Sequence, residues 1–208
     1  MKPFCLCAGI PRSGSTWLFN VSRLIYIQHY SNVYSCWVGD FIRLNMEKAS
    51  VTVVKTHDFN NKNLLSYKPI ILMSRRDLRD IVASHILKGW MEPRQAIKKL
   101  QWMVRVHQQY QPYINYEIEY ADLLNKPLKL ITDIAQILDL SCNPQQIYDA
   151  TLTLKQADKG EQYNKQTLLH HQHHTRRVCG YYKEVLSPAL IKNIETTFED
   201  WLRKWGYM

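Results

Sequence analysis

Residues 10–18 read Ile-Pro-Arg-Ser-Gly-Ser-Thr-Trp-Leu, and they lie between an apolar segment at residues 4–8 and a helical pattern that begins near Thr16. A strand that runs into a loop of small residues and then opens a helix directs free backbone N–H groups at one point. The positive end of the helix dipole lies at the same place. Residues 10–18 therefore predict a phosphate-binding loop.

This loop departs from the ATP-binding pattern Gly-x-x-x-x-Gly-Lys-Ser/Thr, in which the Lys reaches the outer phosphates and the hydroxyl binds magnesium. Gly9 and Gly14 keep the glycine spacing, but Ser15 stands in the Lys position and the cation is Arg12. The best candidate for a metal-anchoring strand, residues 69–73, runs into Ser-Arg-Arg instead of a solitary Asp. The sequence thus predicts that a phosphate is bound without a metal.

Lys55 and His57 form a second group of residues that could take part in catalysis. A neutral imidazole, with an unperturbed pKa of about 6.5, can take a proton from a hydroxyl at physiological pH. Lys55 lies two residues earlier, so it projects to the same side as His57 if the strand continues. Arg76 and Ser84 form a third group, because a bidentate Arg and a hydroxyl suit a terminal phosphate dianion.

These three segments resemble, in the same order, the sulfotransferases that use 3′-phosphoadenosine-5′-phosphosulfate (PAPS). Residues 11–18 are similar to the loop that binds the 5′-phosphosulfate in that family. Lys55-Thr56-His57 is similar to the Lys-Thr-His segment that carries the catalytic base, and residues 76–84 resemble the strand-to-helix element that binds the 3′-phosphate. The resemblance extends from residue 11 to about residue 183.

Two weaker matches complete the nucleotide site that the resemblance implies. Residues 119–124 resemble the Tyr-Glu-Asp-Leu segment beside the adenine, with Ala121 in place of Glu. Residues 175–183 resemble the segment that closes over the 3′-phosphate, with Arg177 in place of a Gly and Tyr182 in place of a Trp. The implied cofactor-binding residues are Arg12, Ser13, Gly14, Ser15, Thr16, Trp17, Arg76, Ser84, Tyr120, Arg176 and Arg177.

The family resemblance implies the following reaction. A sulfuryl group moves from PAPS to a hydroxyl or amine of the acceptor, 3′,5′-adenosine bisphosphate (PAP) is released, and no metal takes part. His57 is the general base, while Arg12 and Lys55 stabilise the charge on the bridging side. Two alternatives stay open: an ATP-dependent small-molecule kinase of related fold, and a non-catalytic protein that binds nucleotides or nucleic acid.

The elements that must position these residues follow from hydrophobic patterning. Strands are predicted at residues 3–9, 51–55, 69–74 and 116–120, and helices at residues 15–28, 77–88, 93–109, 128–138 and 188–205. Strands separated by crossover helices indicate a parallel sheet that is covered on both faces. The predicted fold is a single α/β domain over residues 1–208, with a mainly parallel sheet, of the P-loop nucleotide-kinase-like sulfotransferase type.

Composition sets the class of protein. With 208 residues, of which 46% are hydrophobic, the chain can bury one core. A formal charge of +9 suits anionic partners without choosing among them. The five cysteines form no C-x-x-C pair, and no signal-like segment or run of about 18 apolar residues occurs. The sequence therefore predicts a cytoplasmic protein with reduced thiols, no transmembrane segment and no nucleic-acid partner.

The acceptor is the least determined part of the site. The chain is short for its family, which is compatible with a large or extended acceptor at an open site, with a small alcohol, or with walls supplied by a second subunit of a homodimer. Aromatic residues in 26–41 and around Trp90 and Trp102 are candidates to line the acceptor site, although such residues are more often part of a core. His170, His171, His173 and His174 lack zinc-ligand spacing and are predicted to lie in a loop over residues 156–180.

Overall fold

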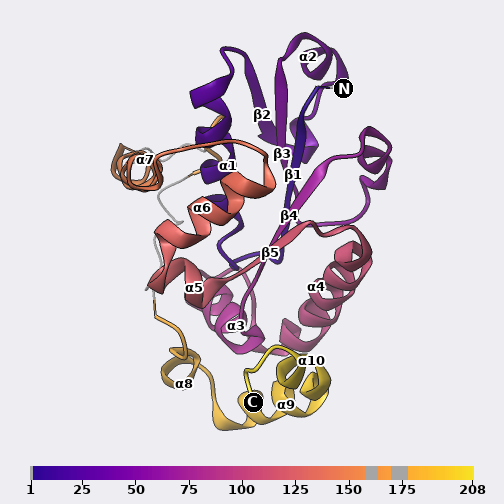
Figure 1. Cartoon of the computed structure of the whole chain (residues 1–208). Helices are drawn as coiled ribbons and strands as arrows, with labels where there is room; N and C mark the ends of the chain where they lie inside the picture. The colour runs from indigo at the N-terminus through magenta and orange to yellow at the C-terminus, as the bar shows by residue number, and fades with distance from the viewer. Residues whose placement is uncertain (1, 158–163, 170–177) are drawn as a thin grey trace.

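The computed structural model describes residues 2–157, 164–169 and 178–208 (Figure 1). Its strands are β1 (Phe4–Gly9), β2 (Val33–Trp37), β3 (Val51–Lys55), β4 (Ile70–Arg75) and β5 (Tyr116–Glu119). Its α-helices are α1 (Ser15–His29), α2 (Arg43–Lys48), α3 (Leu78–Leu87), α4 (Ala96–Tyr110), α5 (Tyr120–Asn125), α6 (Pro127–Ile137), α7 (Pro144–Ala157), α8 (Tyr182–Val185), α9 (Pro188–Thr197) and α10 (Glu199–Lys204). Short 3-10 helices are η1 (Val38–Asp40), η2 (Lys62–Tyr67), η3 (Pro93–Gln95) and η4 (Gln111–Tyr113).

The described strands form one sheet in the order β2-β3-β1-β4-β5, and every neighbouring pair is parallel. In the register of the sheet, Cys7 of β1 lies between Lys55 of β3 and Leu72 of β4. Parallel strands end at the same edge, and ligands of open α/β sheets bind at their carboxyl ends. The three predicted site segments follow the adjacent strands β3, β1 and β4, so the sheet brings them together.

Helices cover both faces of this sheet (Figure 1). Side chains alternate along β1: Cys5 and Cys7 pack in a core with α1, α6 and α7, whereas Leu6 and Ala8 pack on the opposite face with residues of α4 and η2. A parallel sheet that is buried on both faces reads as continuous apolar sequence, and β1, with all six residues buried, shows this. The predicted α/β fold class is confirmed.

The C-terminal helices α9 and α10 pack against α3 and α4, away from the layer that holds α1 (Figure 1). Arg79 of α3 fixes them in place: it pairs with Asp77 and Glu195 and donates to the backbone oxygen of Tyr207. These helices were predicted as one helix at residues 188–205. The structure breaks it at Phe198, whose backbone leaves helical geometry while its side chain is buried.

The close packing of the strand ends predicts a large cost for a side chain at Gly9. A Cβ there would lie 2.4 Å from Ser74 Oγ and 2.9 Å from Ser15 Cβ. We expect Gly9→Ala to lower the free energy of unfolding by about 2 to 3 kcal/mol, measured by urea denaturation. Gly89→Ala is the control, because its Cβ would meet no atom within 4 Å and only its φ of +68° opposes it; it is expected to cost about 1 kcal/mol. Equal losses in the two variants would contradict the steric explanation.

Candidate functional site

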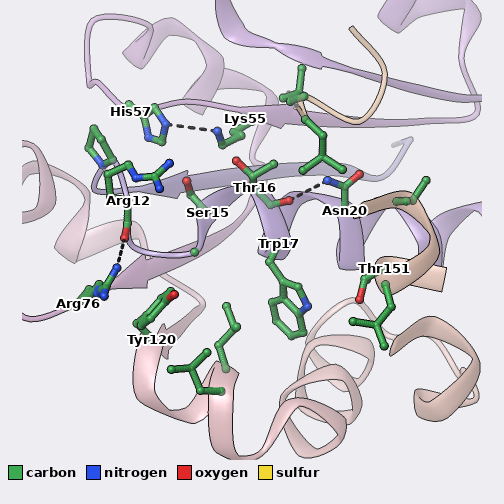
Figure 2. A pocket seen from close by; sticks show the side chains of 18 of the residues that line it. Arg12, Ser15, Thr16, Trp17, Asn20, Lys55, His57, Arg76, Tyr120 and Thr151 are labelled. Atoms are coloured by element: carbon green, nitrogen blue, oxygen red, sulfur yellow. Dashed lines mark hydrogen bonds between the residues drawn. The ribbon is translucent and has the colours of Figure 1, made fainter. Parts of the chain in front are cut away.

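A cavity of about 900 Å³ lies at the carboxyl ends of β1, β3 and β4 (Figure 2). None of the described residues that line it is an Asp or a Glu. The predicted site residues that line it are Arg12, Gly14, Ser15, Thr16, Trp17, Lys55, His57, Arg76 and Tyr120. A cavity with cationic side chains and no carboxylate in its lining favours an anionic ligand.

Hydrogen bonds of Ser13 fix the conformation of the loop between β1 and α1. Ser13 is fully buried and is not among the residues that line the cavity: its N–H donates to the Ile10 carbonyl at 3.1 Å, and its hydroxyl contacts Ile10 and Ser74. Gly14 then adopts a φ of +94°, a conformation that favours glycine, and α1 begins at Ser15. The N-cap residue, Gly14, has no side chain to cap this helix, and the first turn holds no acidic residue, so the N-terminal N–H groups are suited to an anion.

Ser13 therefore differs from the other loop residues in its placement. Sequence reasoning expected it to face the phosphate together with Ser15 and Thr16. In the structure both its N–H and its hydroxyl are used inside the loop. Ser13 therefore stabilises the loop conformation in which the neighbouring residues Arg12 and Gly14 line the cavity.

Arg12 lies at one side of the cavity with a φ of +70°. Its Nε donates to Ser84 Oγ at 2.9 Å, and its guanidinium lies 5.2 Å from the centre of the Trp90 ring. Burial lowers the pKa of Arg12 from its usual value. Arg12 and Ser84 were expected at opposite phosphates of the nucleotide, but the fold puts these two side chains in direct contact.

His57 and Lys55 form a hydrogen-bonded pair beside the loop (Figure 2). The Gly9 carbonyl, 2.7 Å from His57 Nδ1, can only accept, so Nδ1 carries the proton. The Nε2 lone pair of the neutral ring then faces Lys55 Nζ at 3.3 Å. Burial lowers the pKa of Lys55 to about 7. The indole of Trp37 packs against both groups, with its ring centre 5.2 Å from that of His57.

Arg76 lies on the other side of the loop with 2% of its side chain exposed. Its Nη1 donates to the Arg12 carbonyl at 3.2 Å, and its guanidinium stacks on the Tyr120 ring at 3.9 Å (Figure 2). Within the described part of the chain, its buried Nε has no hydrogen-bond partner. A buried donor without a partner is costly, and a ligand in the cavity that Arg76 lines would lower this cost. Arg75 Nε also lacks a hydrogen-bond partner among the described residues, but Arg75 does not line the cavity.

Arg75 at the end of β4 and Arg79 in α3 lie close to Arg76 in the sequence but have different surroundings. Arg75 faces Glu117 and Glu119, and Arg79 faces Asp77 and Glu195. Neither is among the residues that line the cavity. Arg76 also has a carboxylate partner, Asp80 at 3.7 Å, but of these three arginines it alone lines the cavity, and it is the one that the sequence indicated by its register.

Asp80 of α3 holds the chain that follows residue 177. Its carboxylate accepts the N–H groups of Gly180 and Tyr182 at 2.9 and 3.1 Å, and it lies 3.7 Å from Arg76 Nη2. Val178 and Cys179 thereby reach the cavity wall. Arg176 and Arg177, and the predicted His170–His174 cluster, lie outside the described residues.

The opposite wall of the cavity is mostly apolar and comes from α1, α5, α7 and residues 164–169 (Figure 2). Asn20 joins two of these elements, because its Nδ2 donates to the Thr16 carbonyl at 2.9 Å and to the Thr167 carbonyl at 2.8 Å. This wall contains Trp17, Tyr120, Leu123, Leu124, Tyr148, Thr151, Leu152, Leu154, Leu168 and Leu169. The sequence indicated Trp17 and Tyr120 but no residue of α7.

Sequence reasoning also missed His85, which lines the cavity from α3, and it left Trp37 and Trp90 undecided between core and site. Only the tertiary structure places these three side chains. Across the described ranges, no group of three or more His, Cys, Asp or Glu side chains is arranged to hold a metal ion. Over the same ranges, no helix has the length and apolar character of a membrane span.

Known structures share this fold. The crystal structure of mouse sulfotransferase SULT7A1 complexed with PAP matches with a TM-score of 0.73 at 14% identity, over 98% of this chain and 84% of that chain. Retinol dehydratase in complex with androsterone and inactive cofactor PAP matches with a TM-score of 0.65 at 13% identity, over 96% and 80%. Retinol dehydratase in a complex with retinol and PAP matches with a TM-score of 0.64 at 14% identity, over 97% of this chain and 82% of that chain.

No family model matches the sequence, and no curated protein matches it. The structural similarity nonetheless covers nearly the whole chain. The chain therefore has the sulfotransferase fold.

Proposed function

We propose that this chain, which has the sulfotransferase fold, transfers the sulfuryl group of PAPS to a hydroxyl group of an acceptor and releases PAP. The observation that carries the proposal is the convergence, in one cavity, of the uncapped start of α1, the buried Arg76 and the Nε2 lone pair of His57. The first two suit the two phosphates of PAP, and the third suits a proton on the acceptor.

The residues present fit the nucleotide. The loop is tightly packed around Gly9 and Gly14, because a Cβ at either position would lie within 3.0 Å of a neighbouring atom. The absence of these side chains leaves the backbone at the start of α1 accessible to a ligand. The N–H groups of Ser15 and Thr16, together with Arg12, would hold the 5′-phosphate. Arg76 would hold the 3′-phosphate, with Ser84 beside it, and Trp17 and Tyr120 would contact the adenine. PAPS supplies the activated sulfuryl group.

The proposed reaction depends on the tautomer of the neutral His57 ring, in which Nδ1 carries the proton and Nε2 is basic. Its Nε2 takes the proton of the acceptor hydroxyl, and the acceptor oxygen attacks sulfur. The new oxygen–sulfur bond forms as the bond from sulfur to the bridging phosphate oxygen breaks, and that oxygen leaves with PAP. Arg12 and Lys55 stabilise the negative charge that grows on the leaving phosphate. The Gly9 carbonyl, which accepts from Nδ1, keeps the ring in the basic tautomer.

Calorimetric titration of the wild-type protein with PAP, ADP and AMP, without metal, tests the proposal. We expect PAP to bind at least about tenfold more tightly than ADP or AMP, because of the three only PAP carries a 3′-phosphate in addition to a 5′-phosphate. Incubation with PAPS and a panel of alcohols and phenols should then release PAP in magnesium-free buffer. Equal binding of the three nucleotides, or turnover of ATP that requires magnesium, would support the kinase alternative. Salt-sensitive binding of random oligonucleotides alone would support a nucleic-acid-binding protein.

Lys55 should couple nucleotide binding to proton uptake. With a pKa of about 7 in the free protein, its amine is mostly neutral at pH 8. An anionic phosphate nearby favours the charged form and raises that pKa, so binding takes up a proton and the affinity falls as the pH rises above 7. Titration of PAP at pH 8 in buffers of different ionisation enthalpy should give an uptake of about half a proton or more. Lys55→Met should abolish it; an unchanged uptake in this variant would assign the proton to another group.

A further inference from the structure

His85 is a cavity residue that no sequence motif indicated. It lies in the last turn of α3, directly after Ser84, and it is one of the residues that line the cavity although only 7% of it is exposed. The Ile81 carbonyl lies 2.9 Å from Nδ1 and can only accept, so Nδ1 carries a proton. In the neutral ring, Nε2 then keeps its lone pair and is a hydrogen-bond acceptor.

The surroundings of His85 keep this ring neutral. Burial lowers its pKa to about 4, and the positive charges of Arg12 and Lys99 act in the same direction. His57 has the same arrangement, with Nδ1 bonded to a backbone carbonyl. The cavity is therefore lined by two imidazoles whose Nδ1 atoms are both bonded to the backbone, and the reaction proposed above uses only one of them.

His85 belongs to a cluster at the cavity wall with Arg12 and Trp90. The edge-to-face contact of His85 and Trp90 has a centroid distance of 6.3 Å, and the Arg12 guanidinium lies over the same indole at 5.2 Å. Arg12 also lowers the pKa of Lys55, which places the cluster within electrostatic reach of the Lys55–His57 pair. Such a cationic wall disfavours an ammonium donor. A neutral hydroxyl is the donor that suits the lone pair of His85.

We propose that His85 is a specificity-determining residue of the acceptor site, whose Nε2 accepts a hydrogen bond from a second, neutral hydroxyl group of the acceptor. The first hydroxyl is the one that His57 activates, so this inference rests on the proposed sulfuryl transfer. It narrows the acceptor to di- or polyhydroxylated molecules. A site that hydrogen-bonds a substrate hydroxyl discriminates against the analogue without it, because the polar group of the site is then buried without a partner.

The test compares phenol with catechol, resorcinol and hydroquinone, which place a second hydroxyl at three different spacings. With PAPS as donor, kcat/KM is measured for the wild type, for His85→Leu and for His85→Gln, whose amide oxygen retains an acceptor. His29→Leu is the matched control, because His29 lies at the exposed end of α1 and does not line the cavity. For each variant, the kcat/KM of each dihydroxybenzene is divided by the kcat/KM of phenol. The intrinsic reactivity of each acceptor cancels when these ratios are compared between two variants.

We expect at least one ratio to be about tenfold higher in the wild type and in His29→Leu than in His85→Leu. His85→Gln should restore part of the difference. Equal ratios in the wild type and His85→Leu, including the case in which no dihydroxybenzene is used, would overturn the inference. Turnover of phenol by the wild type separates this failure from a failure of the proposed function: if phenol is sulfated and the ratios are equal, only the role of His85 is wrong, whereas PAP binding without sulfation of any acceptor would count against the proposed function.

Discussion

Arg76→Ala is expected to weaken the binding of PAP by about a hundredfold while it leaves the binding of AMP within about threefold of the wild type. The guanidinium is buried, stacks on Tyr120 and carries an Nε that has no partner among the described residues. Charge-assisted hydrogen bonds from an arginine to a phosphate dianion are about twice as strong as neutral ones, and the low dielectric of a buried site strengthens them. Parallel calorimetric titrations of both nucleotides measure the effect.

Arg75→Ala is the matched control for this prediction. Arg75 is the preceding residue and is also an arginine, but it faces Glu117 and Glu119 and packs over Trp205. Its loss should lower the stability of the fold, because it leaves partly buried carboxylates without their cation. The ratio of PAP to AMP affinity should stay as in the wild type. A similar change of that ratio in both variants would mean that general charge, and not Arg76, recognises the 3′-phosphate.

His57→Asn is expected to lower kcat of sulfuryl transfer by about 100- to 10,000-fold. An Asn side chain can still donate to the Gly9 carbonyl, which His57 Nδ1 reaches at 2.7 Å, but it offers no basic nitrogen in place of Nε2. PAP affinity should change little, since the proposed role of His57 is on the acceptor proton. Initial rates of PAP release at saturating PAPS measure the effect, with circular dichroism as a check on folding.

The comparison with His57→Ala sharpens this test. If His57 acts as a base, added imidazole should recover part of the activity of His57→Ala, in which the ring leaves space beside Trp37. A rate within about tenfold of the wild type in either variant would remove His57 from the mechanism. The buried Lys55, whose pKa is lowered to about 7, would then be the next candidate for the base.

The sequence was most informative where strands are buried on both faces. β1, β3 and β4 lie within two residues of their predicted positions, because a central parallel strand leaves no solvent-facing positions to interrupt its apolar run. β2 was missed. It is the edge strand, most of its residues are only half-buried, and its sequence Val-Tyr-Ser-Cys-Trp gives a weak signal.

Helix prediction failed for a related reason. α7 carries few strongly apolar residues, so its period is faint, although Asn143 before Pro144 is a start signal: its side chain accepts the N–H groups of Gln145 and Gln146. The break at Phe198 could not be read from the pattern, because both α9 and α10 are amphipathic. It follows from the burial of Phe198 and Trp201 against α3 and α4.

For the candidate site, local sequence predicted partners that are close along the chain. Lys55 and His57 are two residues apart, and their side chains are in contact as the spacing predicted, although β3 ends at Lys55 and His57 lies just beyond it. The bond from Arg12 to Ser84 joins residues 72 positions apart, and the carbonyl that holds His57 belongs to another strand. Contacts of this kind depend on strand order and helix register, which no spacing rule supplies. His85 illustrates the limit, because its role depends on which face of α3 turns toward the cavity.

The bonds to Asp80 have a consequence for the way the protein is made. Its two backbone partners, Gly180 and Tyr182, come 100 and 102 residues later in the chain. A ribosome that adds about 5 to 20 residues per second would release Asp80 and Arg76 several seconds before those partners exist. During that interval the carboxylate lacks the two N–H groups that it accepts in the folded protein. The wall of the cavity is thus completed late in synthesis, and a nascent chain would hold its phosphate-binding loop before it could close the other side of the pocket.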